Sequence, residues 1–297
     1  MTEKQFASIP KSALPFTGGT KLDEPVVGRT GGLWWRSSGS GTPLVLIQGL
    51  GYPAAMFHRI VPLLEPHYRV TVFDQRGIGN SAKANSLDSL TIGRMASDVA
   101  AVIDDAAGGH ADVLGVSLGG IVAQELAIAS PQKVDRLILA CTHTADSRVV
   151  VAEEEVLEMM RSRAQLSDDE EALRNSVPYV YAPRTSDKLI EEDISVRREM
   201  HRGWDGYTAQ LRASIQYAGT SGRLSRITAE TLVLHGKLDR LVPPGNAEVI
   251  AERIPNAQLH LMPGVSHNFY SEAPRAAAKD ILKFLDSPRA EEAAQAA

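Results

Sequence analysis

The sequence contains little that would suit a disulfide-stapled, membrane-spanning or nucleic-acid-binding protein. Its one cysteine, Cys141, excludes a disulfide within the chain and is typical of a reducing compartment. No apolar run approaches the ~18 residues of a membrane span, and the first residues lack the apolar centre of a secretory signal. The formal net charge of −5 offers no basic footprint for nucleic acid. We therefore expect a soluble, cytoplasmic protein that binds neither membrane nor nucleic acid, and the oligomeric state stays open.

What the chain does contain is a regular series of short apolar runs, within 297 residues of which 43% are hydrophobic. The predicted strands lie at 33–38, 43–48, 68–74, 111–116, 134–141, 231–236 and 257–262. The helix-like segments lie at 54–64, 92–106, 119–129 and 247–254. Strands that alternate with helices predict an α/β fold, with a mostly parallel β-sheet flanked by helices on both faces.

One long stretch interrupts this alternation. Between about residues 143 and 228 the sequence is charged and helix-like, and Ser167 with Glu170 has capping-box spacing. We interpret this stretch as a helical cap, or lid, inserted over the carboxyl edge of the sheet. The predicted division is an N-terminal arm at 1–25, an α/β core at 26–142 and 229–288, the cap at 143–228, and a flexible tail at 289–297.

A serine stands between glycines at the junction of a predicted strand and a predicted helix. In Gly115-Val116-Ser117-Leu118-Gly119 the small residues allow a sharp turn that holds the hydroxyl out from the sheet. Alone, this motif is also compatible with a turn serine that caps the helix. A serine acts as a nucleophile only when a base takes its proton, so the functional interpretation requires a histidine and an acid.

Two later loops supply candidates for both. His267 follows the last predicted strand, and Asp239 follows the strand at 231–236 in a turn with two prolines. Parallel sheets present catalytic groups at the carboxyl ends of their strands, where both loops should lie. His235 and His260 fall inside predicted strands, and we interpret them as structural.

Taken together, four motifs make the chain resemble the α/β-hydrolase superfamily over about residues 33–285. They are the serine turn, "FDQRGIGNS" at 73–81, "LVLHGKLDRLVPP" at 232–244 and "PGVSHN" at 263–268. The resemblance implies a catalytic triad of Ser117, Asp239 and His267, with an acyl-enzyme formed on the serine and neither metal nor organic cofactor. It also implies an oxyanion hole built from the main-chain N–H groups of Leu50 and Leu118. Most relatives have His-Gly in the loop that carries the first of these N–H groups, whereas this chain has Gln48-Gly49-Leu50-Gly51.

The substrate is less well defined by the sequence. We expect a small, largely apolar molecule, with the candidate substrate-binding residues Gly49, Tyr52, His143, Trp204 and Phe269. A carboxylic ester or lactone is favoured, because the chain resembles the enol-lactonase and small-ester hydrolase branch. The alternatives are a carbon–carbon bond hydrolase, a cofactor-free haloperoxidase or perhydrolase, and a ligand receptor with little turnover. Arg76 is interpreted as ordering its loop, and Arg197, Arg198 and Arg202 as a solvated charged face.

Overall fold

An eight-stranded sheet forms the centre of the molecule in a computed structural model that describes residues 24–83, 87–163, 169–200 and 204–288. The strand order is β1-β2-β4-β3-β5-β6-β7-β8. The strands are β1 (Val26–Thr30), β2 (Leu33–Ser38), β3 (Pro43–Ile47), β4 (Arg69–Phe73), β5 (Ala111–Val116), β6 (Val134–Ala140), β7 (Glu230–Gly236) and β8 (Ala257–Met262).

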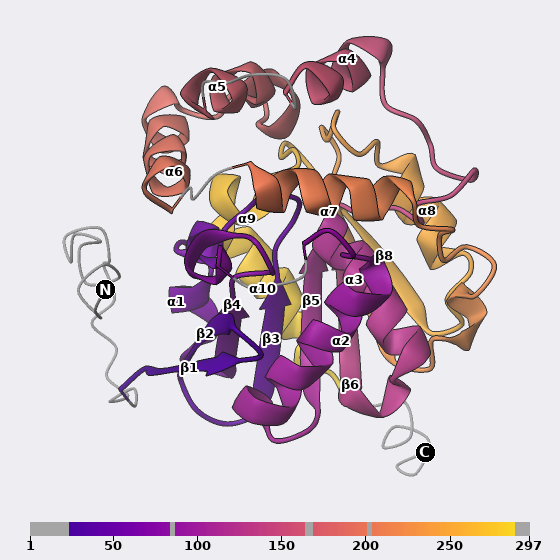
Figure 1. The fold of residues 1–297 in the computed structure, drawn as a ribbon. Coiled ribbons are helices and arrows are strands. Elements are labelled where there is room, and N and C mark those ends of the chain that lie inside the picture. The colour runs from indigo at the N-terminus through magenta and orange to yellow at the C-terminus, as the bar shows by residue number, and fades with distance from the viewer. Residues whose placement is uncertain (1–23, 84–86, 164–168, 201–203, 289–297) are drawn as a thin grey trace.

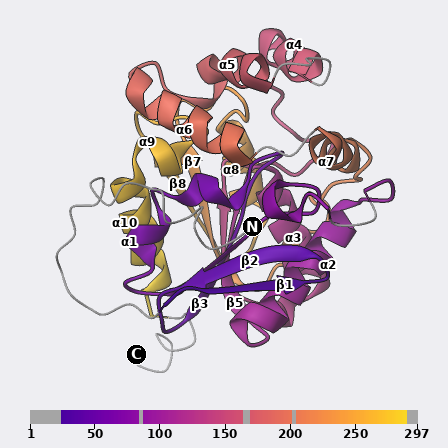
Figure 2. The ribbon, with the colours of Figure 1, turned by 60° about the vertical axis from the view of Figure 1, so that its left-hand side comes forward.

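The six neighbouring strands β4, β3, β5, β6, β7 and β8 run parallel, whereas β2 pairs antiparallel with β4 and β1 pairs antiparallel with β2. The mostly parallel sheet confirms the predicted fold class. Strand β1 was not predicted from the sequence; it lies at the edge of the sheet (Figure 2) and exposes Val26 and Val27. A solvated edge strand lacks the continuous apolar run that identifies a buried one.

Helices cover both faces of the sheet because its strands are apolar on both sides. In β3, Val45 and Ile47 belong to the apolar cluster that includes residues of α2, α3 and α8, whereas Leu44 and Leu46 belong to the cluster that includes residues of α1, α9 and α10. Successive side chains of a strand point to opposite faces, so one strand contributes to both cores. The flanking helices are α1 (Val61–Leu64), α2 (Ile92–Val102), α3 (Leu118–Ala129), α8 (Gly245–Ala251), α9 (Phe269–Glu272) and α10 (Pro274–Leu285).

Short helical turns accompany these helices, and two of them interrupt predicted helices. The predicted helix at 54–64 is divided into η3 (Ala54–Phe57) and α1. Pro62 has no N–H to donate, so it suits the first turn of a new helix and not the interior of a longer one. The helix at 92–106 ends in a π-helical turn, η5 (Ile103–Ala107), and the other turns are η4 (Gly79–Ser81), η6 (Pro131–Lys133) and η7 (Leu224–Arg226).

Between β6 and β7 the described residues form four α-helices, which lie over the carboxyl ends of the strands (Figure 1). They are α4 (Glu154–Arg163), α5 (Asp169–Val180), α6 (Asp187–Met200) and α7 (Asp205–Ile215). The predicted capping box cannot be compared with the structure because Ser167 lies outside the described residues. None of the helices in the described ranges is both long and apolar enough to cross a membrane.

Candidate active site

Ser117 lies at the tight turn between β5 and α3. Its backbone has φ 55° and ψ −121°, a left-handed conformation that a residue with a Cβ adopts only under strain. The N–H of Ser117 donates to the carbonyl of Ala140 at the end of β6, at 2.9 Å. This anchored, strained turn places the serine side chain at the carboxyl edge of the sheet.

The glycines around Ser117 are required by close backbone contacts. A Cβ on Gly115 would lie 2.3 Å from the carbonyl oxygen of Gly119, and a Cβ on Gly119 would lie 2.3 Å from that of Ile47. No side chain fits at either position unless the strand and the helix move apart. The glycines therefore allow α3 to start directly against the ends of β3 and β5.

Asp239 and His267 form a buried pair on neighbouring loops. Nδ1 of His267 lies 2.8 Å from Oδ2 of Asp239, and both side chains are buried. The other oxygen, Oδ1, accepts a hydrogen bond from the N–H of Val242 at 2.9 Å. The loops follow β7 and β8, which are adjacent in the sheet, so the strand order itself brings the acid to the histidine.

The carboxylate of Asp239 is strongly stabilised in its charged form. Burial alone would raise its pKa, but the charge and hydrogen bonds of His267 and His235 outweigh burial and lower the pKa to about 2. Asp239 is therefore ionised at any pH at which His267 could act as a base, and it can hold the Nδ1–H of that imidazole.

His235 is a site residue that the sequence analysis did not identify. It is fully buried, and its Nε2 lies 2.8 Å from the carbonyl oxygen of Val242 and 3.2 Å from Oδ2 of Asp239. A position in the middle of an apolar run gives no sign of such a role. The signal in the sequence is the four-residue spacing to Asp239, across the end of β7.

The loop after β3 approaches the serine closely. A Cβ on Gly49 would lie 3.1 Å from Cβ of Ser117, and Gln48 accepts the N–H of Gly49 on its own Oε1 at 3.0 Å. The Gln48 side chain thus binds the main chain of its own loop and stabilises the loop conformation. None of the described residues accepts a hydrogen bond from the N–H of Leu50, and the N–H of Leu118 opens the first turn of α3, where helical N–H groups lack intrahelical partners.

A mostly apolar cavity of about 210 Å³ joins these elements. Ser117 and His267 both line it, beneath apolar side chains from the segment between β6 and β7. The cavity also contains the predicted residues Leu50, Tyr52, Leu118 and His143. Further lining residues are Ile121, Val149, Val150, Val151, Ala152, Leu157, Met159, Met160, Ser176, Val180, Tyr207, Leu211, Ser214, Leu241, Val242, Pro243 and Asn246.

Three predicted substrate residues lie behind this lining and not within it. Phe269 is fully buried in the core, with its ring 5.4 Å from that of Tyr270. Trp204 packs edge-on against Tyr207 at 5.3 Å, and Tyr207 is the residue that lines the cavity. Gly49 packs against Ser117 and supports the turn. The sequence pattern does not reveal which of two aromatic residues three positions apart faces inward.

The arginines also differ in part from expectation. Arg76 is buried and donates to both oxygens of Asp98, at 2.9 and 2.7 Å, which confirms its loop-ordering role. Arg198 is exposed and pairs with Glu170, as a solvated face predicts. Arg197 is instead buried, with its guanidinium 3.9 Å from the ring centre of Tyr52, and Arg202 lies outside the described residues.

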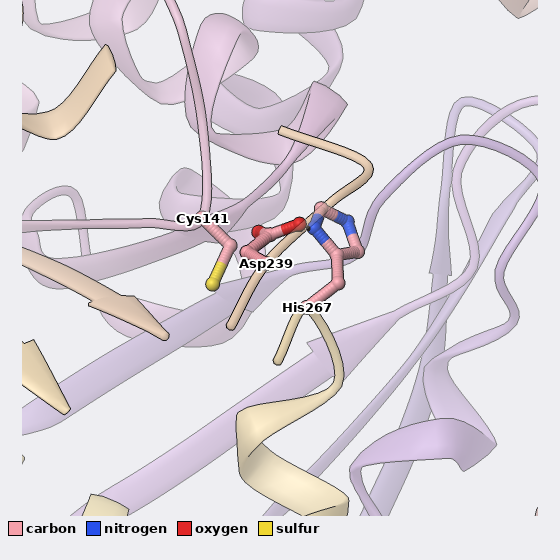
Figure 3. Close-up of side chains that lie close together, drawn as sticks. All are labelled: Cys141, Asp239 and His267. Carbon is pink, nitrogen blue, oxygen red and sulfur yellow. Dashed lines mark hydrogen bonds and ion pairs between the residues drawn. The ribbon is translucent and has the colours of Figure 1, made fainter. Parts of the chain in front are cut away.

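Cys141, Asp239 and His267 form a cluster whose donor atoms lie within 4.8 Å of one another (Figure 3). Burial and the neighbouring charge of Asp239 raise the pKa of the Cys141 thiol well above its ordinary value. Metals bind the thiolate, not the thiol, and Asp239 is already engaged by two histidines. The cluster therefore suits a catalytic pair with a neutral thiol beside it better than a metal centre.

A parallel sheet with a strained serine turn, a later Asp–His pair and a shared cavity defines an α/β-hydrolase type of protein. A sequence model of the alpha/beta hydrolase fold matches residues 42–274. The chain belongs to this family.

Individual relatives agree with this assignment. The chain is 32% identical to a poly(3-hydroxyalkanoate) depolymerase of Ectopseudomonas oleovorans, over 84% of this chain and 86% of the relative. It is 28% identical to a pimeloyl-acyl-carrier-protein methyl ester esterase of Photobacterium profundum, over 86% of this chain and 99% of that one. The crystal structure of the enol-lactonase from Burkholderia xenovorans LB400 shares the fold, with a TM-score of 0.74, 23% identity and coverage of 88% of this chain and 100% of that chain.

Proposed function

We propose that the protein is a serine hydrolase that cleaves a carboxylic ester or lactone of a small, largely apolar substrate. The observation that carries the proposal is the strained Ser117 turn and the buried His267–Asp239 pair on one mostly apolar cavity. The relatives named as a depolymerase and a methyl ester esterase act on ester bonds by their names, which favours the same bond here.

In this mechanism Asp239 accepts the Nδ1–H of His267 and so leaves Nε2 as the base. His267 takes the proton of Ser117 while the serine oxygen attacks the carbonyl carbon, and the N–H groups of Leu50 and Leu118 stabilise the oxyanion. His267 then protonates the leaving alcohol, which departs and leaves an acyl-enzyme. Water activated by the same histidine attacks the acyl group and regenerates the serine.

The helices between β6 and β7 act as a lid in this proposal. Met159, Met160 and Tyr207 present apolar surface to the cavity from α4 and α7. An apolar roof excludes bulk water from the serine and favours substrates with an apolar acyl or alcohol part. Tyr52 and His143 contribute the polar groups on the core side.

The test is intact-protein mass after exposure to a fluorophosphonate, together with turnover of a p-nitrophenyl ester. Wild type should gain a single adduct and show sustained turnover, and the Ser117→Ala variant should show neither. Ser81 is a buried serine outside the cavity, so Ser81→Ala is the matched control and should still be labelled. An adduct that persists in Ser117→Ala, or wild type without adduct and turnover, would contradict the proposal.

A further inference from the structure

The loop that follows β6 is held in a strained conformation on both sides of His143. Cys141 has φ 47° and Ala145 has φ 57°, although neither is a glycine. Residues with a Cβ rarely adopt a positive φ. Such strained backbone persists only where several surrounding contacts hold it in place. Here Gln124 donates through Nε2 to the carbonyl of His143 at 3.1 Å, and the N–H of Thr220 donates to the carbonyl of Thr144 at 2.9 Å. These contacts thus fix the main chain of His143 and of the residue that follows it.

The ring of His143 is fixed as well. The N–H of Ala145 donates to Nδ1 of His143 at 2.9 Å. A nitrogen that accepts a hydrogen bond carries no proton, so Nδ1 is the bare nitrogen and Nε2 carries the hydrogen in the neutral ring. Ala145, whose N–H makes this hydrogen bond, is itself one of the two residues with a positive φ. The strained backbone therefore helps to place the N–H that selects the tautomer.

The neutral form is favoured over the charged form. Burial and then the nearby His267 lower the pKa of His143, as does His235, and the carboxylates of Asp146 and Asp239 only partly oppose them, so that its value is about 4. Protonation of Nδ1 would also break the hydrogen bond from Ala145. His143 is consequently neutral wherever His267 can serve as a base.

The Nε2–H is therefore the polar group that His143 can offer to a bound molecule. His143 lines the same cavity as Ser117 and His267. Among the described residues, none accepts a hydrogen bond from this nitrogen. A donor left without an acceptor when the cavity closes on an apolar group is costly, whereas an acceptor oxygen placed there is favoured. With its proton in place, Nε2 cannot act as a second base.

We propose that His143 is a specificity-determining residue, whose Nε2–H binds an acceptor oxygen of the substrate next to the bond that is cleaved. This inference rests on the proposed hydrolase function and specifies its substrate class. The favoured molecules are esters or lactones with a keto or ether oxygen near the scissile carbonyl. That second oxygen is distinct from the carbonyl oxygen itself, which the main-chain N–H groups of Leu50 and Leu118 take.

Two variants separate the donor from the loop. In His143→Asn the shorter amide can place its oxygen where Nδ1 accepts from Ala145, but it has no donor at the Nε2 position. In His143→Gln an amide N–H reaches the Nε2 position. For each variant we measure the ratio of kcat/KM for an oxygenated substrate to kcat/KM for its plain analogue. When this ratio is compared between variants, the difference in intrinsic reactivity between the two substrates cancels.

Two substrate pairs locate the oxygen. The pair p-nitrophenyl 3-oxohexanoate and p-nitrophenyl hexanoate tests the acyl side. The pair 2-methoxyethyl hexanoate and butyl hexanoate tests the alcohol side. We expect His143→Asn to lower the wild-type ratio about 10-fold for one pair, and His143→Gln to keep it within about 3-fold. Wild-type ratios that His143→Asn leaves unchanged for both pairs would overturn the inference, even though turnover itself upheld the hydrolase. Absent turnover of every ester would instead contradict the proposed function.

A second measurement is independent of activity. Two-bond ¹H–¹⁵N correlation spectra of the full chain report the tautomer of each histidine, and the His143→Asn spectrum identifies the His143 signals. The expected result is a bare Nδ1 and a protonated Nε2 from pH 5 to pH 9. A hydrogen on Nδ1, or a charged ring at pH 6, would overturn the proposed donor.

Discussion

Asp239 accepts hydrogen bonds on both oxygens, from His267 and from the main chain at Val242, and Nε2 of His235 lies 3.2 Å from Oδ2. A buried carboxylate is stable only when its charge is met by such partners, since burial of an isolated ion is very costly. The same partners leave His267 one orientation. At the scale of single residues, the buried contacts therefore fix Asp239, and Asp239 in turn orients His267 as the base for Ser117.

Ser117 and His267 should behave as one functional unit. We expect Ser117→Ala and His267→Ala each to lower kcat by roughly 10⁴- to 10⁶-fold, and the double variant to lose little more, because either change removes the same proton transfer. Steady-state kinetics on a p-nitrophenyl ester measures all three. Losses that multiply in the double variant would show that the residues act separately.

The structural elements show how little space the serine turn leaves. Gly119→Ala should destabilise the fold by at least about 1–3 kcal/mol and depress activity, because its Cβ would collide with the backbone of β3. Gly222 provides the matched control, since a Cβ there meets nothing within 4 Å. Urea denaturation of the two variants should separate them clearly, and equal stability would contradict the close contact.

Helix α6 is attached to the core through a buried acid. Asp193 is fully buried, accepts from the hydroxyl of Tyr181 at 2.9 Å and lies 3.4 Å from Nε of Arg59, and Ser271 also donates to it. The neighbouring Glu192 pairs with the same arginine at the surface.

Loss of the two acids should therefore have unequal effects. Asp193→Ala should lower the free energy of unfolding by about 3–5 kcal/mol because it leaves the buried donors without their partner. Glu192→Ala should cost less than about 1 kcal/mol because water replaces an exposed pair. Chemical denaturation decides between them, and similar losses would show that α6 is not anchored through Asp193.

The sequence predicted those elements whose signal is local. Short apolar runs identified seven strands within one or two residues, and Gly-x-Ser-x-Gly placed Ser117 at a strand–helix turn, where the structure has it. The solvated β1 was missed because its side chains do not repeat an apolar pattern. Tyr207 was passed over for Trp204 because helical spacing does not define how a helix is rotated over a cavity. The role of His235 was missed because a histidine inside an apolar strand is typical of a structural residue, although its contacts, to Asp239 and Val242, are local in sequence.

For the whole molecule, two buried groups make stability depend on pH. The pKa of Asp239 is lowered from 3.8 to about 2, so its contribution is full above about pH 4 and is lost as the pH falls toward 2. The pKa of His143 is lowered from 6.5 to about 4, so the unfolded chain binds this proton more readily. Stability should therefore fall as the pH decreases from about 6.5 to 4, by up to roughly 3 kcal/mol from His143.

Urea denaturation between pH 2 and pH 8 measures this dependence. His143→Asn should flatten the curve between about pH 4 and 6.5 without abolishing its slope, because burial also lowers the pKa of His58. The two proteins should remain parallel below pH 4, where Asp239 titrates in both. Curves that are parallel over the whole range would contradict a buried neutral His143.

The chain contains a single cysteine, and the fold places it fully inside the protein, beside Asp239 and between the ends of β6 and β7. Thiol reagents reach such a group only when the surrounding structure opens, and a protonated thiol reacts slowly even then. The rate at which a thiol reagent modifies Cys141 therefore reports how often the structure around the catalytic half of the sheet opens. Because Cys141 is native, no engineered label is needed. Comparing the modification rate with and without a bound substrate analogue shows whether the analogue slows this opening.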